Sequence, residues 1–159
     1  MKPRIEPSHV PPGGFRAMLG LEEYLHGCGL PPNLMHLLKL RASQINGCAY
    51  CIDMHWKDLR AIGEPEHRLY ALDAWRESPW YSDKERAALE WAEEVTLIST
   101  THAGDAAYEK LKAQFSEKEI ADLTLLLATI NAWNRLAISM RSLPGVYVSK
   151  LKPPAPAMI

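Results

Sequence analysis

Apolar side chains recur along the middle of the chain at spacings of three and four residues, which is the period of an amphipathic α-helix. Proline, glycine and helix-capping residues separate these apolar segments from one another. The β-branched residues are scattered, and no segment alternates apolar and polar residues for more than a few positions. The pattern therefore predicts an all-α protein, a single domain of six to seven helices.

The helix boundaries follow from the residues that interrupt the apolar pattern. Gly27-Cys28-Gly29 ends the first segment, and Asn46-Gly47 ends the second. The S-x-x-E patterns that begin at Ser82 and Ser116 are capping boxes, in which side chains bond the free amides at a helix start. We expect helices at about 15–27, 31–46, 48–63, 67–75, 83–98, 105–115 and 117–141.

Prolines concentrate at the two ends of the chain, where they prevent a continuous helix. Four of them precede Gly13-Gly14, and three follow Lys152. We therefore expect a proline-rich N-terminal arm at residues 1–14, a helical domain at 15–145 and a C-terminal tail at 146–159.

Composition and charge narrow the range of functions. The 159 residues are 47% hydrophobic and 23% charged, a globular composition, and the net charge of −1 provides no positive field to attract nucleic acid. The first ten residues lack the apolar stretch of a signal peptide. The most apolar window, 120–140, contains polar side chains that are costly in lipid. We expect a cytoplasmic protein that has neither nucleic acid nor a membrane as its partner.

The segment from Asn46 to His55 carries the clearest chemical signal. Cys48, Cys51 and His55 occupy positions i, i+3 and i+7, so a helix places them on one face near its N-terminus. The free amides and the positive end of the helix dipole lower thiol pKa values there, and two thiols at this spacing can form a reversible disulfide. His55, one turn after Cys51, can supply or accept a proton. The spacing favours thiol redox chemistry.

Two other interpretations of the cysteines stay open. Cys48, Cys51 and His55 could be three ligands of a zinc ion, although no second C-x-x-C or H-x-x-x-H pattern completes the site. They could also be structural, because buried free cysteines are common. Cys28, between two glycines, is most simply a passive thiol. No dinucleotide-binding fingerprint is present, so we predict no cofactor and expect electrons from an external thiol, a lipoyl group or a small dithiol.

Residues 40–55, L-R-A-S-Q-I-N-G-C-A-Y-C-I-D-M-H, resemble the core of the AhpD-like alkylhydroperoxidases of the carboxymuconolactone decarboxylase superfamily. The similarity continues through residues 63–64, 68–76 and 85–93. The resemblance implies an all-α subunit that assembles into a homotrimer or homohexamer and reduces a small hydroperoxide. It also implies that Cys51 attacks the peroxide and Cys48 resolves the product to a disulfide, whereas the helix dipole alone would favour Cys48 as the attacking thiol.

His36 departs from the family pattern, which has a glutamate twelve residues before the first cysteine. The short Asn46-Gly47 turn predicts antiparallel packing of its two helices, which would bring His36 close to His55. His36 would then replace the glutamate in a proton relay, with activity falling on acidification through about pH 6.5. The alternative is that His36 only packs beside Leu37. The predicted catalytic residues are Cys51, Cys48, His55 and His36.

Two rival functions also fit the sequence. A lactone decarboxylase of the same superfamily would need no thiols, so the intact cysteine pair argues against it. A non-enzymatic helical oligomer that binds zinc or senses oxidants would retain the cysteines without turning over a substrate. Peroxide consumption in the presence of a dithiol separates both rivals from a thiol peroxidase.

The last predicted helix is apolar almost all round, which a small helical domain cannot cover by itself. This predicts a homo-oligomer. Polar groups on such a helix need partners, so Asn131, Asn134 and Arg135 predict hydrogen bonds between helices or between subunits. The apolar positions are Leu123, Leu125, Leu126, Leu127, Ile130, Trp133 and Ile138.

Overall fold

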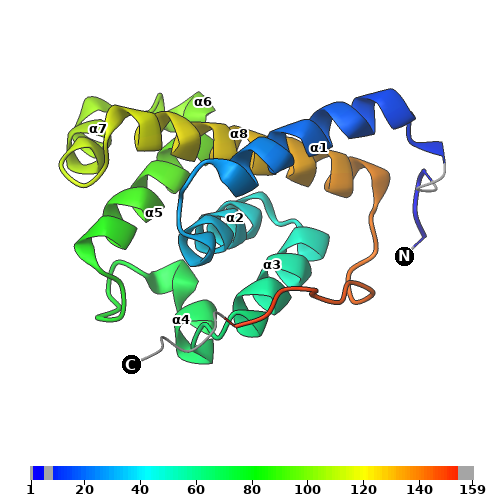
Figure 1. Ribbon diagram of the computed structural model, residues 1–159, viewed down its shortest axis with the longest axis horizontal. Coiled ribbons are helices and arrows are strands. Elements are labelled where there is room, and N and C mark those ends of the chain that lie inside the picture. The colour runs from blue at the N-terminus through cyan, green and yellow to red at the C-terminus, as the bar shows by residue number, and fades with distance from the viewer. Residues whose placement is uncertain (1, 6–8, 154–159) are drawn as a thin grey trace.

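α-Helices make up nearly all of the regular structure in the computed structural model, which describes residues 2–5 and 9–153. That part of the chain contains eight α-helices and no strand, which confirms the predicted all-α class. Figure 1 shows their arrangement. In chain order they are α1 (Pro12–Gly27), α2 (Pro32–Asn46), α3 (Ala49–Ala61), α4 (Glu66–Tyr70), the 3-10 turn η2 (Leu72–Ala74), α5 (Asp83–Thr96), α6 (Ile98–Thr101), α7 (Asp105–Lys112) and α8 (Glu117–Met140).

Several helix boundaries differ from the sequence-based expectation. The helix predicted at 67–75 is divided into α4 and η2, and the helix predicted at 83–98 ends at Thr96, so α6 adds a single turn to the count. The predicted arm at 1–14 is too long, because α1 begins at Pro12. Proline suits the first helical position, since its φ is already helical and its missing N–H would have no partner there.

The helix α2 lies at the centre of the fold, with α3, α5 and α8 packed around it (Figure 1). Its buried side chains include a continuous apolar stripe, and it also buries polar groups such as Lys39 and Ser43. Buried polar groups need hydrogen-bond partners in a tightly packed interior. Ser43 accordingly bonds Asn134 of α8, and Lys39 pairs with Glu22 of α1.

The turn between α2 and α3 fixes the geometry of the site. Gly47 ends α2 in the left-handed conformation, with φ of 68°, and its N–H donates to the carbonyls of Ser43 and Gln44. Glycine adopts this conformation without the steric cost of a Cβ atom. The chain then reverses at Cys48, so that α3 begins at Ala49 and packs along α2 as predicted.

The capping boxes predicted at Ser82 and Ser116 are both present. In each one, the serine side chain accepts a hydrogen bond from the N–H three residues later, and the glutamate at that position bonds back to the serine N–H. These bonds satisfy amides that have no partner within the helix. The starts of α5 and α8 are thus set by local sequence.

After α8 the chain runs back along α3, as the orange-to-red segment of Figure 1 shows. Lys57 on α3 donates hydrogen bonds to the carbonyls of Gly145 (3.3 Å) and Tyr147 (3.0 Å), and the Gly145 N–H donates to Asp53 (3.0 Å). The predicted tail at 146–159 is therefore fastened to α3 over its first residues. Residues 1, 6–8 and 154–159 of the predicted arm and tail lie outside the described residues.

No helix in the described part of the chain combines the length and the apolar character required to cross a membrane.

Candidate thiol and histidine site

The two motif cysteines lie side by side at the N-terminus of α3. Cys48 is the residue that precedes the helix, in an extended conformation, and Cys51 lies in its first turn. Both are free thiols, their sulfur atoms are 2.8 Å apart, and each residue is 1% exposed. The predicted helix at 48–63 thus starts one residue later, and the cap position directs the free amides of the first turn towards Cys48.

The electrostatics of the pair favour the thiolate at Cys48. The hydrogen bond from the Cys51 thiol, with further bonds from the Tyr50 and Cys51 amides, lowers the pKa of Cys48 from 9.0 to about 7 despite its burial. The same thiol–thiol bond, together with burial, raises the pKa of Cys51. One proton is therefore shared by two sulfur atoms, and the pair titrates as a unit.

Asn134 on α8 connects the thiol pair to α2. Its side-chain amide lowers the pKa of each thiol and donates to Ser43 Oγ (3.1 Å). Asn46 donates to Asn134 Oδ1 and to Asn131 Oδ1, each at 2.9 Å. Asn131 and Asn134 thus bond side chains of other helices, which is the first of the two predicted alternatives, bonds between helices or between subunits. Arg135 instead bonds Asn131, within its own helix.

His36 of α2 and His55 of α3 meet on the inner face of this hairpin. Their Nδ1 atoms are 3.4 Å apart, so the antiparallel packing brings them together as predicted. Burial is the main cause that lowers the pKa of His36 to about 4 and the pKa of His55 well below its ordinary value. Both imidazoles are therefore neutral around pH 7. The prediction that activity falls on acidification through about pH 6.5 required an imidazole that titrates there, and neither His36 nor His55 does.

Asp58, which sequence reasoning missed, faces the two histidines. Its Oδ2 lies 3.8 Å from His36 Nδ1, and its Oδ1 accepts hydrogen bonds from Tyr147 (2.8 Å) and Ser149 (2.6 Å) of the C-terminal segment. Asp58 is three residues after His55 and so on the same face of α3, which the sequence could have shown. Nothing in the local pattern around Tyr147 or Ser149 indicates this contact.

A buried ion pair borders the histidines on the other side. Lys39 Nζ lies 2.6 Å from Glu22 of α1, and Glu22 also accepts a hydrogen bond from the Trp133 indole (3.0 Å). The positive charge of Lys39 contributes to the lowered pKa values of both imidazoles. Glu22 acts in the opposite direction on His36, so Lys39 is the member of the pair that helps to keep the histidines neutral.

His55 Nε2 is the one buried side-chain nitrogen or oxygen without a hydrogen-bond partner among the described residues. Such groups are rare, because an unbonded polar atom in the interior is costly. The atom belongs to the residue one turn after Cys51.

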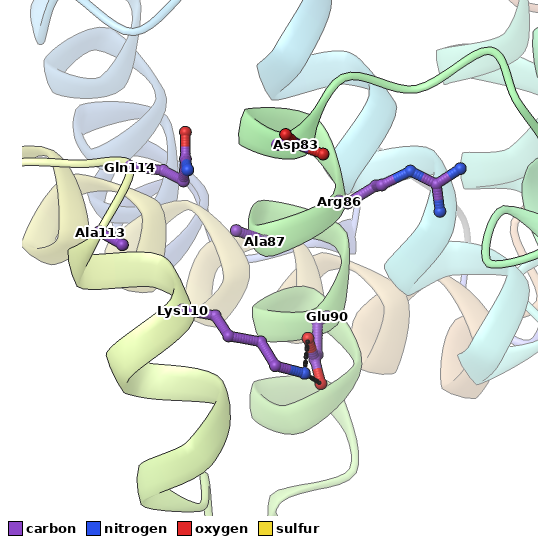
Figure 2. A pocket seen from close by; sticks show the side chains of 7 residues that line it. All are labelled: Asp83, Arg86, Ala87, Glu90, Lys110, Ala113 and Gln114. Carbon is purple, nitrogen blue, oxygen red and sulfur yellow. Dashed lines mark hydrogen bonds and ion pairs between the residues drawn. The ribbon is translucent and has the colours of Figure 1, made fainter.

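A groove of about 360 Å³ lies between α5 and α7. Figure 2 shows its lining residues, among them Lys110 and Glu90, whose Nζ and Oε1 atoms are 2.8 Å apart. Its lining contains neither a cysteine nor a histidine. The groove is therefore separate from the thiol and histidine cluster.

The lowered pKa of Cys48 leads to a direct prediction. Ultraviolet thiolate absorbance of a Cys28→Ser protein, in which only the pair titrates, should rise with an inflection near pH 7, below the free-thiol value of about 8.5. Asn134→Leu removes a donor to the thiolate, so it should move the inflection to higher pH. An inflection at or above the free-thiol value in the Cys28→Ser protein would contradict the electrostatic account.

Comparison with known proteins places this arrangement in a family. The model of the carboxymuconolactone decarboxylase family matches residues 12–94, which include α2, α3 and the thiol pair. The uncharacterised protein YdfG of Bacillus subtilis is 40% identical over 140 residues, covering 88% of this chain and 95% of YdfG.

Solved structures agree with this placement. A structure from Agrobacterium tumefaciens, ATU0492, is described both as a protein of unknown function and as a candidate antioxidant defence protein AhpD. It is 45% identical, with a TM-score of 0.88, over 92% of this chain and all of the other. The debrominase Bmp8 has the same fold at 22% identity, with a TM-score of 0.75 over 82% of this chain and 70% of its own. The chain belongs to the carboxymuconolactone decarboxylase family and has the AhpD-like fold.

Proposed function

We propose that this protein is a thiol-dependent reductase of small hydroperoxides that uses Cys48 and Cys51 as a redox pair. The observation that carries the proposal is the pair itself, with two free thiols 2.8 Å apart and a lowered pKa at Cys48. Low-pKa thiols next to a resolving cysteine are typical of peroxide-reactive sites. The similarity to ATU0492, with its description as a candidate AhpD, supports the same class of activity.

The reaction has three steps. Proton transfer along the short S–H···S contact gives a thiolate on Cys51, which attacks the terminal peroxide oxygen, and the O–O bond breaks to leave a sulfenic acid and an alcohol. The Cys48 thiol then displaces hydroxide from the sulfenic acid to form a disulfide and water. An external dithiol or lipoyl group reduces the disulfide by exchange and returns both thiols.

His55 supplies the proton that the leaving alkoxide needs. Its Nε2 has no partner within the described residues, and its Nδ1 faces His36, which in turn faces Asp58. The position that holds a glutamate in the family pattern thus holds a histidine here, and a carboxylate from α3 lies against it. We propose that this chain passes protons to and from the thiol pair.

Peroxide consumption with a dithiol as the reductant tests the function. We expect turnover of a small alkyl hydroperoxide that depends on both the dithiol and the intact cysteines. A lactone decarboxylase would show no peroxide turnover and would still convert its lactone when the thiols are blocked. An oxidant sensor would form the disulfide once and would show no sustained turnover with the dithiol.

The proposed relay predicts the effect of changing His36. His36→Ala removes the group between His55 and Asp58, so the turnover rate should fall by about 10²-fold, the lower end for loss of an acid–base group. His36→Glu restores the family's residue and should retain much of the activity. An unchanged rate in a folded His36→Ala protein would make His36 a packing residue.

We also propose that the protein is a homotrimer or homohexamer. Within this chain, only part of the apolar surface of α8 is covered, since Leu125 (41% exposed), Leu136 and Ile138 face outwards. The neighbouring helix α1 exposes Phe15 and Leu19, both at 45%. Large apolar side chains exposed on two adjacent helices are typical of an interface.

Light scattering at micromolar concentration measures the assembly directly. We expect a trimer or hexamer, and we expect Leu125→Lys combined with Ile138→Lys to shift the protein towards monomer, because charges would be buried at the interface. A wild-type monomer at this concentration would contradict the proposal.

A further inference from the structure

Three side chains between α2 and α3 are arranged like the ligands of a metal ion. The Nδ1 atoms of His36 and His55 are 3.4 Å apart, His36 Nδ1 lies 3.8 Å from Asp58 Oδ2, and one ligand atom from each residue falls within 4.8 Å of the others. These separations are long for hydrogen bonds, which for nitrogen and oxygen atoms cluster at about 2.9–3.0 Å. The three groups therefore face one another without bonding strongly.

The spacing matches a tetrahedral coordination shell. With metal–nitrogen distances of about 2.0–2.1 Å, two ligand atoms of a tetrahedral zinc site are about 3.3–3.4 Å apart. The separation of the two imidazole nitrogens, 3.4 Å, is of this size, and the carboxylate oxygen needs only a small shift to complete the third position. Octahedral magnesium or calcium sites prefer oxygen ligands, so two imidazoles and one carboxylate favour a transition metal.

The surroundings suit a cation. Imidazole nitrogens and carboxylate oxygens are common ligands of transition-metal ions. Asp58 and Glu22 contribute two negative charges near the cluster and Lys39 contributes one positive charge, which leaves one net negative charge. Asp58 is held in place by the hydroxyls of Tyr147 and Ser149 on its other oxygen, the kind of outer hydrogen bonding that orients a metal-binding carboxylate.

We propose that His36, His55 and Asp58 form a binding site for one Zn²⁺-class transition-metal ion, distinct from the cysteine pair. The ligand set differs from the cysteine-containing set that the sequence left open, because neither Cys48 nor Cys51 belongs to it. Three protein ligands leave the fourth tetrahedral position for water. The metal occupies the Nδ1 lone pairs of both imidazoles, so the loaded protein loses the histidine route for protons while both thiols stay free.

Calorimetric titration of Zn²⁺ into a Cys48→Ser/Cys51→Ser double variant tests the site, because serine removes the thiols that would otherwise bind zinc. We expect one equivalent of Zn²⁺ to bind. Adding His36→Asn or Asp58→Asn should weaken zinc binding by at least about 100-fold. Loss of a residue that only supports a ligand weakens metal binding by up to about 100-fold, and loss of a ligand itself should cost at least as much. Asp53→Asn, which changes another carboxylate of α3 paired with Lys57, is the matched control and should leave binding unchanged.

Two results would overturn the site. One is that the folded Cys48→Ser/Cys51→Ser variant binds no zinc. This result would overturn the site even if the wild-type protein binds zinc, because the wild type would then bind it through its thiols. The other is binding that survives both His36→Asn and Asp58→Asn. Circular dichroism of each variant establishes that it is folded. The titration is independent of peroxide turnover, so the metal site and the proposed function can fail separately.

Discussion

Replacing Cys51 with serine should reduce dithiol-dependent peroxide turnover by at least about 10³-fold, because a hydroxyl is a far weaker nucleophile than a thiolate. The substitution changes one buried atom, and serine occupies slightly less volume than cysteine, so the helical fold should persist. Cys28→Ser is the matched control, since Cys28 lies outside the motif and follows α1. The control should retain the wild-type rate.

Cys48→Ser tells the two roles apart. If Cys51 attacks, this variant should accumulate a sulfenic acid on Cys51 that a sulfenic-acid-specific reagent captures, because no second thiol is available to resolve it. The lowered pKa of Cys48 favours the opposite assignment, in which Cys48 attacks and Cys51 resolves. A sulfenic acid on Cys48 in the Cys51→Ser protein, with an inert Cys48→Ser protein, would reverse the assigned roles.

His55→Gln should lower the turnover rate by about 10²- to 10³-fold, within the range for loss of a general acid–base group. Glutamine keeps the size and a hydrogen-bonding end in a residue that is only 4% exposed, so the loss reflects proton transfer more than packing. The disulfide should still form on slow exposure to peroxide. The measurement is the turnover rate against pH with saturating dithiol.

His67→Ala provides the control for that experiment. His67 contacts the Trp80 ring and takes no part in the cluster at α2 and α3, so its loss should leave the rate unchanged.

The wild-type rate should fall as the pH drops below about 7, the pKa of Cys48, because protonation removes the thiolate of the pair. A wild-type rate in folded His55→Gln would remove His55 from the mechanism.

The sequence was sufficient to predict the α2–α3 hairpin and the meeting of His36 and His55 within it. The Asn46-Gly47 turn is short, so the two helices must run antiparallel, and this alone brings His36 towards His55. The i, i+3 spacing of the cysteines likewise brings them together at the start of α3. Such local and short-range geometry can be read from periodicity and turn chemistry.

Long-range polar contacts could not be predicted in the same way. Tyr147 and Ser149 reach Asp58 across about 90 residues of chain, from a segment without helical periodicity. Asn134 is an intermediate case. A polar residue on an apolar helix predicted that a hydrogen-bond partner exists, but the sequence did not identify that partner as Ser43 or the thiols. The balance between burial and charge that keeps His36 and His55 neutral likewise depends on their three-dimensional surroundings.

A single-turnover experiment tests the central claim most directly. Reduced protein, freed of external thiol, is mixed with a small excess of alkyl hydroperoxide, and both the peroxide consumed and the protein mass are measured. The account predicts that each chain consumes one peroxide, loses two hydrogen atoms and acquires a Cys48–Cys51 disulfide that peptide mapping identifies. Peroxide that is not consumed, or that disappears while Cys48 and Cys51 remain free thiols, would contradict it.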